Sequence, residues 1–160
     1  MSAAAIQSLA ILLEQNERER DQALAAQQRA QAASDAAAAQ AEQLVVYRRD
    51  YEQRWNAQFR QGGHIEVVRS YHSFMARLTQ AVEQQARVAE HALQMLAQAA
   101  TGVREAELKV ASVRKLIERR TQELRVAAER RDQKLTDEAA SRAVWNNRPG
   151  AQGSGRLRIA

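Results

Sequence analysis

One run of apolar residues, spaced alternately three and four apart, constrains this chain more than any other feature. It begins at Val68 and continues to Ala127, and only Gln85 and Arg120 interrupt its apolar character. A 3.5-residue repeat held over such a length specifies a long α-helix in a left-handed coiled coil. Its members are Val68, Tyr71, Met75, Leu78, Val82, Gln85, Ala89, Ala92, Leu96, Ala99, Val103, Ala106, Val110, Val113, Ile117, Arg120, Leu124 and Ala127.

The residues before this repeat predict a second long helix. Strong helix formers dominate the whole chain, and Pro149 is its single proline. The segment 61–64 contains the paired glycines, which favour a reversal of the chain. The sequence therefore predicts an all-α fold with a long two-helix antiparallel coiled-coil hairpin over residues 1–143. Its helices cover about 3–60 and 65–143, its turn covers 61–64, and residues 144–160 are expected to form a disordered basic tail.

The first helix is less regular than the second. An alanine-rich stretch lies at 30–41, between two groups of larger apolar residues. Small residues let two helices approach closely but bury little apolar area, so we expect a thin middle and a better anchored end near the turn. The larger residues are Ile6, Leu9 and Leu13 before the stretch, and Leu44, Tyr47, Tyr51, Trp55 and Phe59 after it.

A reversal near Gly62 also predicts the register of the hairpin. Residues whose numbers add to about 125 face each other, so residues from about 122 to 143 have no partner in the first helix. This stretch is expected either to dock onto another protein, or to pack on the N-terminal residues or fray. It carries Leu124, Val126, Ala127 and Leu135 beside Arg125, Arg130, Arg131 and Lys134.

Nothing in the sequence has the pattern of a catalytic, metal or cofactor site. Cysteine is absent, and His64, His72 and His91 lack the spacing of four residues that a helical metal site needs. No glycine-rich phosphate loop is present. We therefore expect a protein that is not an enzyme and works by binding other proteins.

Charge and hydropathy restrict its partners and location. The net charge of +5 comes from basic residues in the second helix, where they are interleaved with glutamates, and in the tail, whereas a phosphate-binding protein more often concentrates them. Nucleic acid is therefore not an expected partner. No signal peptide is visible, and every apolar run is shorter than the ~20 residues that span a bilayer. These features predict a soluble, cytoplasmic protein.

A cluster near the turn has a wider apolar stripe than a two-helix interface needs. The register places Tyr51 opposite Phe74, Tyr47 opposite Leu78, and Gln40 opposite Gln85. Aromatic side chains with a polar end are common in protein–protein contacts, but internal packing explains the same pattern. Trp145 allows a similar pair of interpretations, as an anchor for a partner or as an exposed aromatic at a helix end.

Three segments resemble the FliJ family of flagellar export proteins. They are QAEQLVVYRRDY at 40–51, YHSFMARLTQAVEQQ at 71–85 and RDQKLTDEAASRA at 131–143. Together with the helix lengths and the central turn, the resemblance covers most of residues 1–143. It implies a component of the flagellar type III export apparatus, similar to the central stalk of rotary ATPases.

The resemblance implies two protein-binding sites. The first would bind the cytoplasmic domain of the export gate protein through Gln40, Leu44, Tyr47, Tyr51, Phe74, Leu78, Ala81 and Gln85. The family pattern has histidine at Gln85, which puts a protonation role there in doubt. The second would bind and stimulate the hexameric export ATPase at the open end, near residues 6–24 and 114–138. The basic side chains expected to contribute are Arg119, Arg120, Arg125, Arg130, Arg131 and Lys134.

The family also implies an escort role for substrate-specific export chaperones, and membrane association only through partners. Two alternatives remain open on the sequence. The chain could serve an injectisome of virulence type III secretion as the equivalent stalk, or it could be a purely structural coiled coil that dimerises as a scaffold.

Overall fold

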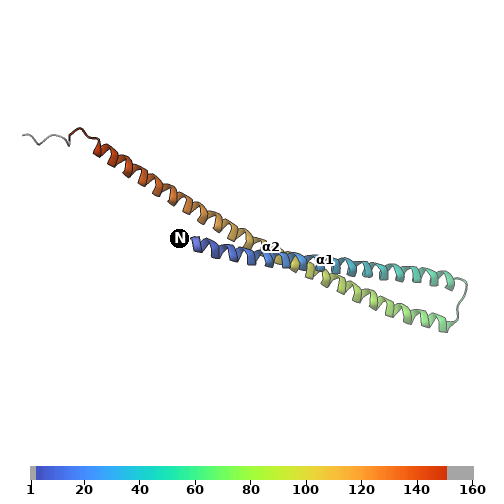
Figure 1. The fold of residues 1–160 in the computed structure, drawn as a ribbon. Coiled ribbons are helices and arrows are strands. Elements are labelled where there is room, and N and C mark those ends of the chain that lie inside the picture. Colours follow the sequence, from blue (N-terminus) through green and yellow to red (C-terminus); the bar gives the residue numbers. More distant parts are fainter. Residues whose placement is uncertain (1–2, 151–160) are drawn as a thin grey trace, which may run out of the picture. The chain divides into compact units, whose positions relative to one another are not determined.

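The computed structural model describes residues 3–150, which form two long helices joined by a short turn (Figure 1). Helix α1 covers Ala3–Phe59 and helix α2 covers Ile65–Asn146. No strand occurs in the described residues, so the predicted all-α fold of two long helices is confirmed. Helix α2 continues past residue 143 to Asn146, and most of the predicted tail, residues 151–160, lies outside the described part of the chain.

The turn between the helices depends on both glycines of the pair. Gly62 has a φ of 100°, a left-handed conformation that favours glycine, and its amide donates to the Phe59 carbonyl at 3.2 Å. Gly63 is needed for a different reason, because a Cβ there would lie 3.2 Å from the Phe59 ring. The His64 carbonyl then accepts hydrogen bonds from the amides of Val67 and Val68, which starts α2.

The described chain divides into two compact units, which we call the hairpin unit and the terminal unit. The hairpin unit contains residues 12–112, and the terminal unit contains residues 3–11 with 113–150. In the hairpin unit, α1 and α2 run antiparallel on either side of the turn. The Tyr51 and Phe74 rings lie 4.6 Å apart, and the Gln85 side-chain amide donates to Gln40 at 3.2 Å. These two contacts have the register that the sequence predicts.

The interface between the helices, which we call the seam, follows the predicted repeat on α2. Within the hairpin unit every predicted member from Val68 to Val110 is buried or half-buried. The most enclosed is Val110, which keeps 2% of its surface exposed. Alternate steps of three and four keep one side of the helix facing its partner, and burial along that line stabilises the pair.

On α1 the seam has the same spacing but contains several polar residues. Its buried or half-buried members in the hairpin unit are Leu13, Asn16, Arg20, Ala23, Gln27, Ala30, Ser34, Ala37, Ala41, Leu44, Arg48, Tyr51 and Trp55. Tyr47, one of the larger apolar residues of this helix, does not lie on this line. Tyr47 is 50% exposed, and its neighbour Arg48 takes the half-buried position. The long aliphatic stem of arginine can cover apolar surface while its guanidinium reaches water.

The terminal unit combines the first turns of α1 with the C-terminal part of α2. Ile6 and Leu9 are half-buried there, Val113 is buried, and Ile117 and Leu124 are half-buried. From residue 127 to residue 150 every residue is exposed, including Ala127, which the repeat had placed in the seam. Beyond Ala127 the apolar repeat gives way to charged residues, so this stretch of α2 is a helix without a packed face in the described structure.

Candidate functional site

The cluster near the turn, residues 40–51 and 71–85, is brought together as predicted. We call it the turn cluster, with Gln40, Leu44, Tyr47, Tyr51, Phe74, Leu78, Ala81 and Gln85 as its members. The Tyr51 ring connects it across the hairpin, since its centroid lies 4.6 Å from that of Phe74 on α2, and it lies 6.1 Å from the Tyr47 ring on its own helix. The sequence left two interpretations open for this cluster, internal packing and contact with a partner. Each of them describes some of its members.

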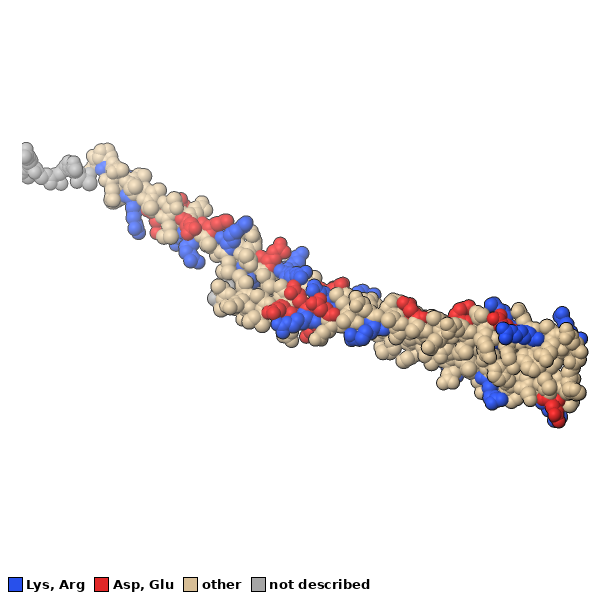
Figure 2. All heavy atoms as spheres, turned by 45° about the vertical axis from the view of Figure 1, so that its right-hand side comes forward, with Lys and Arg blue, Asp and Glu red and all other residues tan. Residues whose placement is uncertain are grey.

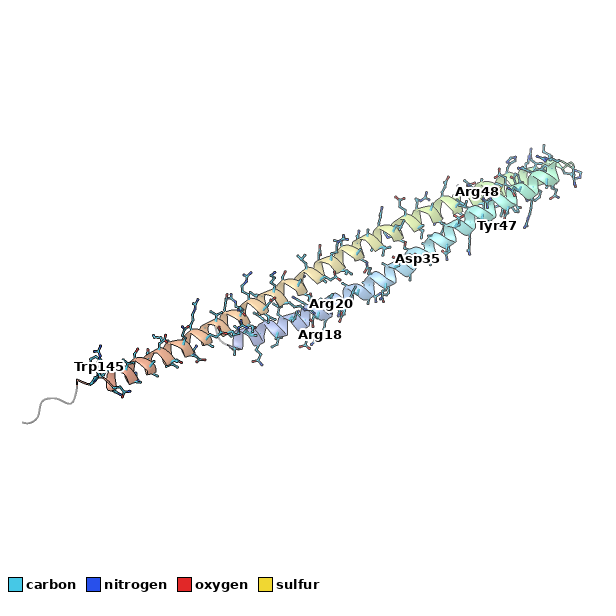
Figure 3. All side chains as sticks on the ribbon, turned by 90° about the horizontal axis from the view of Figure 1, so that it is seen from above. Arg18, Arg20, Asp35, Tyr47, Arg48 and Trp145 are labelled. Atoms are coloured by element: carbon cyan, nitrogen blue, oxygen red, sulfur yellow. The ribbon has the colours of Figure 1, made fainter. Side chains whose placement is uncertain are left out.

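Some members belong to the seam and others to the surface. Leu78 is buried, and Leu44, Tyr51 and Gln85 are half-buried on the seam line. Tyr47 is exposed beside the half-buried Arg48 (Figure 3), and Gln40 is exposed as well. A partner can therefore reach Tyr47 and Gln40 directly, whereas Leu78 acts by holding the two helices together.

An aromatic core supports the surface residues of the turn cluster. The Tyr71 ring is buried, with ring centroids 5.6 Å from Trp55 and 5.2 Å from Phe59. Burial raises the pKa of the Tyr71 phenol above its usual 10.0, with smaller contributions from the Glu52 carboxylate and the Tyr51 phenol. The ring is therefore a neutral packing element at physiological pH, and it fixes the position of Tyr51.

The basic residues predicted to contact an ATPase ring lie in the terminal unit. Arg120 is half-buried and pairs with Glu123 at 3.1 Å, and Arg125 pairs with Glu129 at 3.5 Å. The other four side chains are exposed and form no ion pair in the described structure: Arg119, Arg130, Arg131 and Lys134. On the face drawn in Figure 2, blue and red side chains alternate along this part of α2, whereas they are sparse over much of the hairpin.

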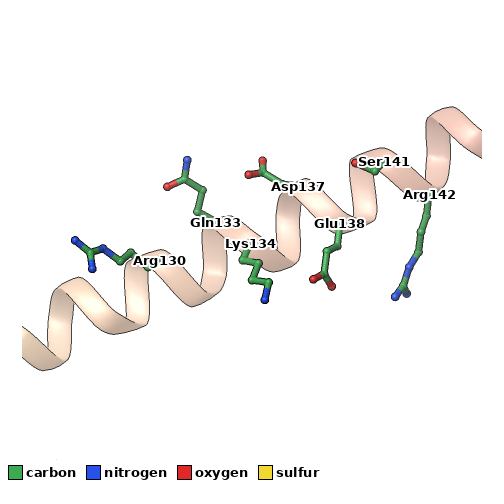
Figure 4. A pocket seen from close by; sticks show the side chains of 7 residues that line it. All are labelled: Arg130, Gln133, Lys134, Asp137, Glu138, Ser141 and Arg142. Atoms are coloured by element: carbon green, nitrogen blue, oxygen red, sulfur yellow. The ribbon is translucent and has the colours of Figure 1, made fainter.

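No enclosed cavity is formed by the C-terminal part of α2. The side chains in Figure 4 project from successive turns of one helix, and no second element of the described structure faces them. They are Arg130, Gln133, Lys134, Asp137, Glu138, Ser141 and Arg142. Such a surface offers charges to a partner but does not enclose a small molecule.

Trp145 lies at the end of this helix and is 69% exposed. The Arg148 guanidinium is 5.4 Å from the centre of its indole ring, a cation–π contact that closes the last turn. The amide of Asn147 also donates to the Ala143 carbonyl at 3.1 Å. The indole therefore has a local packing role while most of its surface remains open.

The described residues contain neither a group of side chains that could hold a metal ion nor a segment that could cross a membrane. No group of three or more His, Cys, Asp or Glu side chains there is placed to hold a metal ion. Among the same residues, neither helix contains a segment long and apolar enough to cross a bilayer.

Comparisons with known proteins identify the family. No curated protein and no solved structure matches the chain. The model of the family described as "Flagellar FliJ protein" matches residues 6–149, which include α1 from Ile6 onward, all of α2, the turn and all residues of the two candidate sites. The match covers most of the 160 residues. The chain therefore belongs to the flagellar FliJ protein family and is a component of the flagellar type III export apparatus.

Proposed function

We propose that this protein is a non-enzymatic stalk of the flagellar export apparatus that links the export ATPase to the export gate. The terminal unit binds and stimulates the hexameric ATPase, and the turn cluster binds the cytoplasmic domain of the gate protein. An escort role for substrate-specific chaperones accompanies these contacts. The protein works in the cytoplasm and reaches the inner membrane only through its partners.

The observation that carries the proposal is the fully exposed stretch of α2 from residue 127 to Asn146. Its seam positions change from apolar residues to Arg131 and Lys134, so it has no reason to pair with another apolar helix. A helix of this kind can enter a ring of subunits and meet the charged loops that line it. Charges of this type attract an oppositely charged partner over about 8 Å at physiological salt.

A charge-reversal experiment tests the ATPase contact. The ATPase rate of the cognate export ATPase would be titrated with the full chain and with a triple variant, Arg130→Glu, Arg131→Glu and Lys134→Glu. We expect the wild-type protein to stimulate the rate. The variant is expected to need an about tenfold higher concentration for half-maximal stimulation, which corresponds to a loss of about 1.4 kcal/mol of binding free energy. The three side chains are exposed, so the fold is expected to remain intact.

A matched control uses three exposed arginines of the hairpin unit, Arg54→Glu, Arg69→Glu and Arg87→Glu. It changes the net charge by the same amount and is expected to stimulate like the wild type. Equal stimulation by both triple variants would contradict a contact at the terminal unit. Loss of stimulation by both would indicate a general charge effect instead.

The gate contact is tested by binding of the isolated cytoplasmic domain of the gate protein. Tyr47→Ala removes an exposed ring and is expected to weaken binding by about tenfold without lowering the melting temperature, as for an interface aromatic. Trp145→Ala removes another exposed ring, far along the sequence, and serves as the control. Unchanged binding by Tyr47→Ala would remove this tyrosine from the proposed site.

A further inference from the structure

The heptad register of the hairpin unit shows a feature that the sequence alone did not reveal. With the seam residues at positions a and d, the g positions of both helices lie on one side of the seam and the e positions on the other. In coiled coils these flanking positions are usually charged. On α1, residues 26, 33, 40 and 47 occupy g, and on α2, residues 67, 74, 81, 88 and 95 occupy g.

None of these g residues is charged, and on α2 all are apolar. We call them the g stripe, which consists of Ala26, Ala33, Gln40, Tyr47, Val67, Phe74, Ala81, Val88 and Met95. Val88 and Met95 expose 47% and 45% of their surface. The next g positions outside the stripe are charged on α1, at Glu19 and Arg54, and Lys109 follows on α2 after Gly102. The stripe is therefore a bounded apolar surface along one side of the hairpin. The e positions at the same heights are also uncharged, and Leu93 there is 59% exposed, so the bordering charges distinguish the two sides.

The charges that border the g stripe have a small basic excess. The adjacent c positions contain Arg29 and Arg77 with His91, and one acid, Asp50, lies at the end nearest the turn. On the opposite side, the b positions that border the e residues contain four acids, Asp35, Glu42, Glu83 and Glu90, and two arginines near the turn, Arg49 and Arg69. The two flanks of the hairpin thus differ in the charge that a partner would meet.

We propose that the g stripe binds one amphipathic α-helix of a partner protein, whose apolar face is bordered by acidic residues. Apolar residues at heptad spacing match the period of a helix that lies along the hairpin. From residue 67 to 95 the stripe is about 42 Å long at 1.5 Å per residue, enough for about four heptads of a third helix. The basic border supplies charge complementarity and the orientation of that helix.

Two other occupants fit the stripe less well. A second copy of this chain, packed stripe to stripe, would bring Arg29 and Arg77 against the same residues of its partner. Nucleic acid would place phosphates over an apolar centre that offers them no hydrogen-bond donors. An acid-flanked helix satisfies both the apolar centre and the basic border.

This inference deepens the proposed gate contact and rests on it in part, because Gln40, Tyr47, Phe74 and Ala81 belong to both surfaces. It extends the contact by two heptads to Val88 and Met95, and it states the chemistry of the partner segment. The probe is the isolated cytoplasmic domain of the gate protein, and the full chain is used throughout.

The test compares two double substitutions at the same height on opposite flanks of α2. Val88→Asp with Met95→Asp places two charges in the g stripe, and Ala86→Asp with Leu93→Asp places two charges on the e flank. All four side chains are exposed, so both variants are expected to keep the wild-type melting temperature. We expect the g variant to weaken binding of the gate domain at least tenfold and the e variant to change it less than twofold.

A second variant tests the charge argument without altering the apolar surface. Arg29→Glu with Arg77→Glu is expected to weaken binding about fivefold at low salt and less at high salt. Arg87→Glu, which lies at an outward f position, is expected to have no effect. A photo-reactive residue at position 88 then identifies the partner segment, which should show apolar heptads beside acidic residues.

The outcomes separate this inference from the proposed function. Binding that is lost in Tyr47→Ala but kept in the g variant would leave the gate contact in place and overturn the extended stripe. Equal losses in the g and e variants would also overturn it, as would cross-linking to a basic or non-helical segment. Absence of binding by the wild-type protein would overturn the gate contact and the stripe together.

Discussion

Single residues in the seam of α1 affect specificity as well as stability. Asn16 and Ser34 are buried at seam positions, where an apolar residue would contribute more burial. A buried polar residue in a coiled coil fixes register and oligomeric state and lowers stability. We interpret these two residues as elements that keep α1 paired with α2 of the same chain.

Replacing Asn16 with leucine is expected to raise the free energy of unfolding by about 1 kcal/mol, because the seam gains apolar area. The same change is expected to increase self-association at high protein concentration, since the register is less strictly defined. Thermal unfolding and sedimentation measure the two effects. Gln15→Leu is the control at an exposed neighbour, and a gain of the same size there would contradict the role of the seam position.

Tyr71 gives the molecule a dependence on alkaline pH. Its folded-state pKa is raised above the unfolded value near 10.0, so the folded chain retains the phenolic proton more strongly than the unfolded chain. The resulting stability is fully present below about pH 10 and is lost as the pH rises through the folded-state pKa.

Tyr71→Phe should therefore unfold with a smaller loss of stability between pH 10 and pH 11.5 than the wild type, while the two proteins stay within about 1 kcal/mol at pH 7. Chemical denaturation at several pH values measures this difference. If the free energy of unfolding fell equally with rising pH in the two proteins, the Tyr71 phenol would not contribute to the pH dependence of stability.

At the scale of the helices, α1 and α2 have unequal seams. The middle of α1 contributes small residues, and Ala37 keeps 8% of its surface exposed. A larger side chain at Ala37 would therefore have to displace its neighbours in the seam. The thin middle predicted from the alanine-rich stretch thus corresponds to small buried residues at the interface.

Ala37→Leu is expected to lower the free energy of unfolding by about 1–3 kcal/mol, because overpacking forces the two helices apart. Ala36→Leu places the same side chain at an exposed neighbour and should change stability by less than about 0.5 kcal/mol. Chemical denaturation distinguishes the two. A neutral effect of Ala37→Leu would mean that the seam adjusts at little cost in this region.

For the whole molecule, the pairing within one chain argues against a dimerising scaffold. The most buried apolar residues of α2, including Val82, Val103 and Val110, are covered in a single chain. Little of the seam is left for a second copy. The g stripe is smaller, and its basic border opposes pairing with itself.

Sedimentation at micromolar concentration should therefore show a monomer. The physical reason is that the apolar seam is already buried inside one chain. The same experiment at several salt concentrations serves as a control for charge effects. A stable dimer at low micromolar concentration would favour the scaffold function over the stalk.

The sequence by itself determined the two helices, the turn and the seam of α2. Its repeat is set by the helical period, and each apolar member faces the same side of α2 whatever its partner is. The paired glycines specify the turn through conformational freedom and close approach. These features are local, so a single sequence is enough to predict them.

Only the tertiary structure decided which residues of α1 face the seam. Tyr47 and Arg48 are adjacent, and both side chains can cover apolar surface. Hydrophobicity alone favours Tyr47 for the seam position, but pairing with α2 places Arg48 there. The same pairing defined the g positions and thus the stripe that contains Val88 and Met95. Which flank of a helix is open depends on the register of its partner, and the polar seam of α1 conceals that register from a search for apolar periodicity.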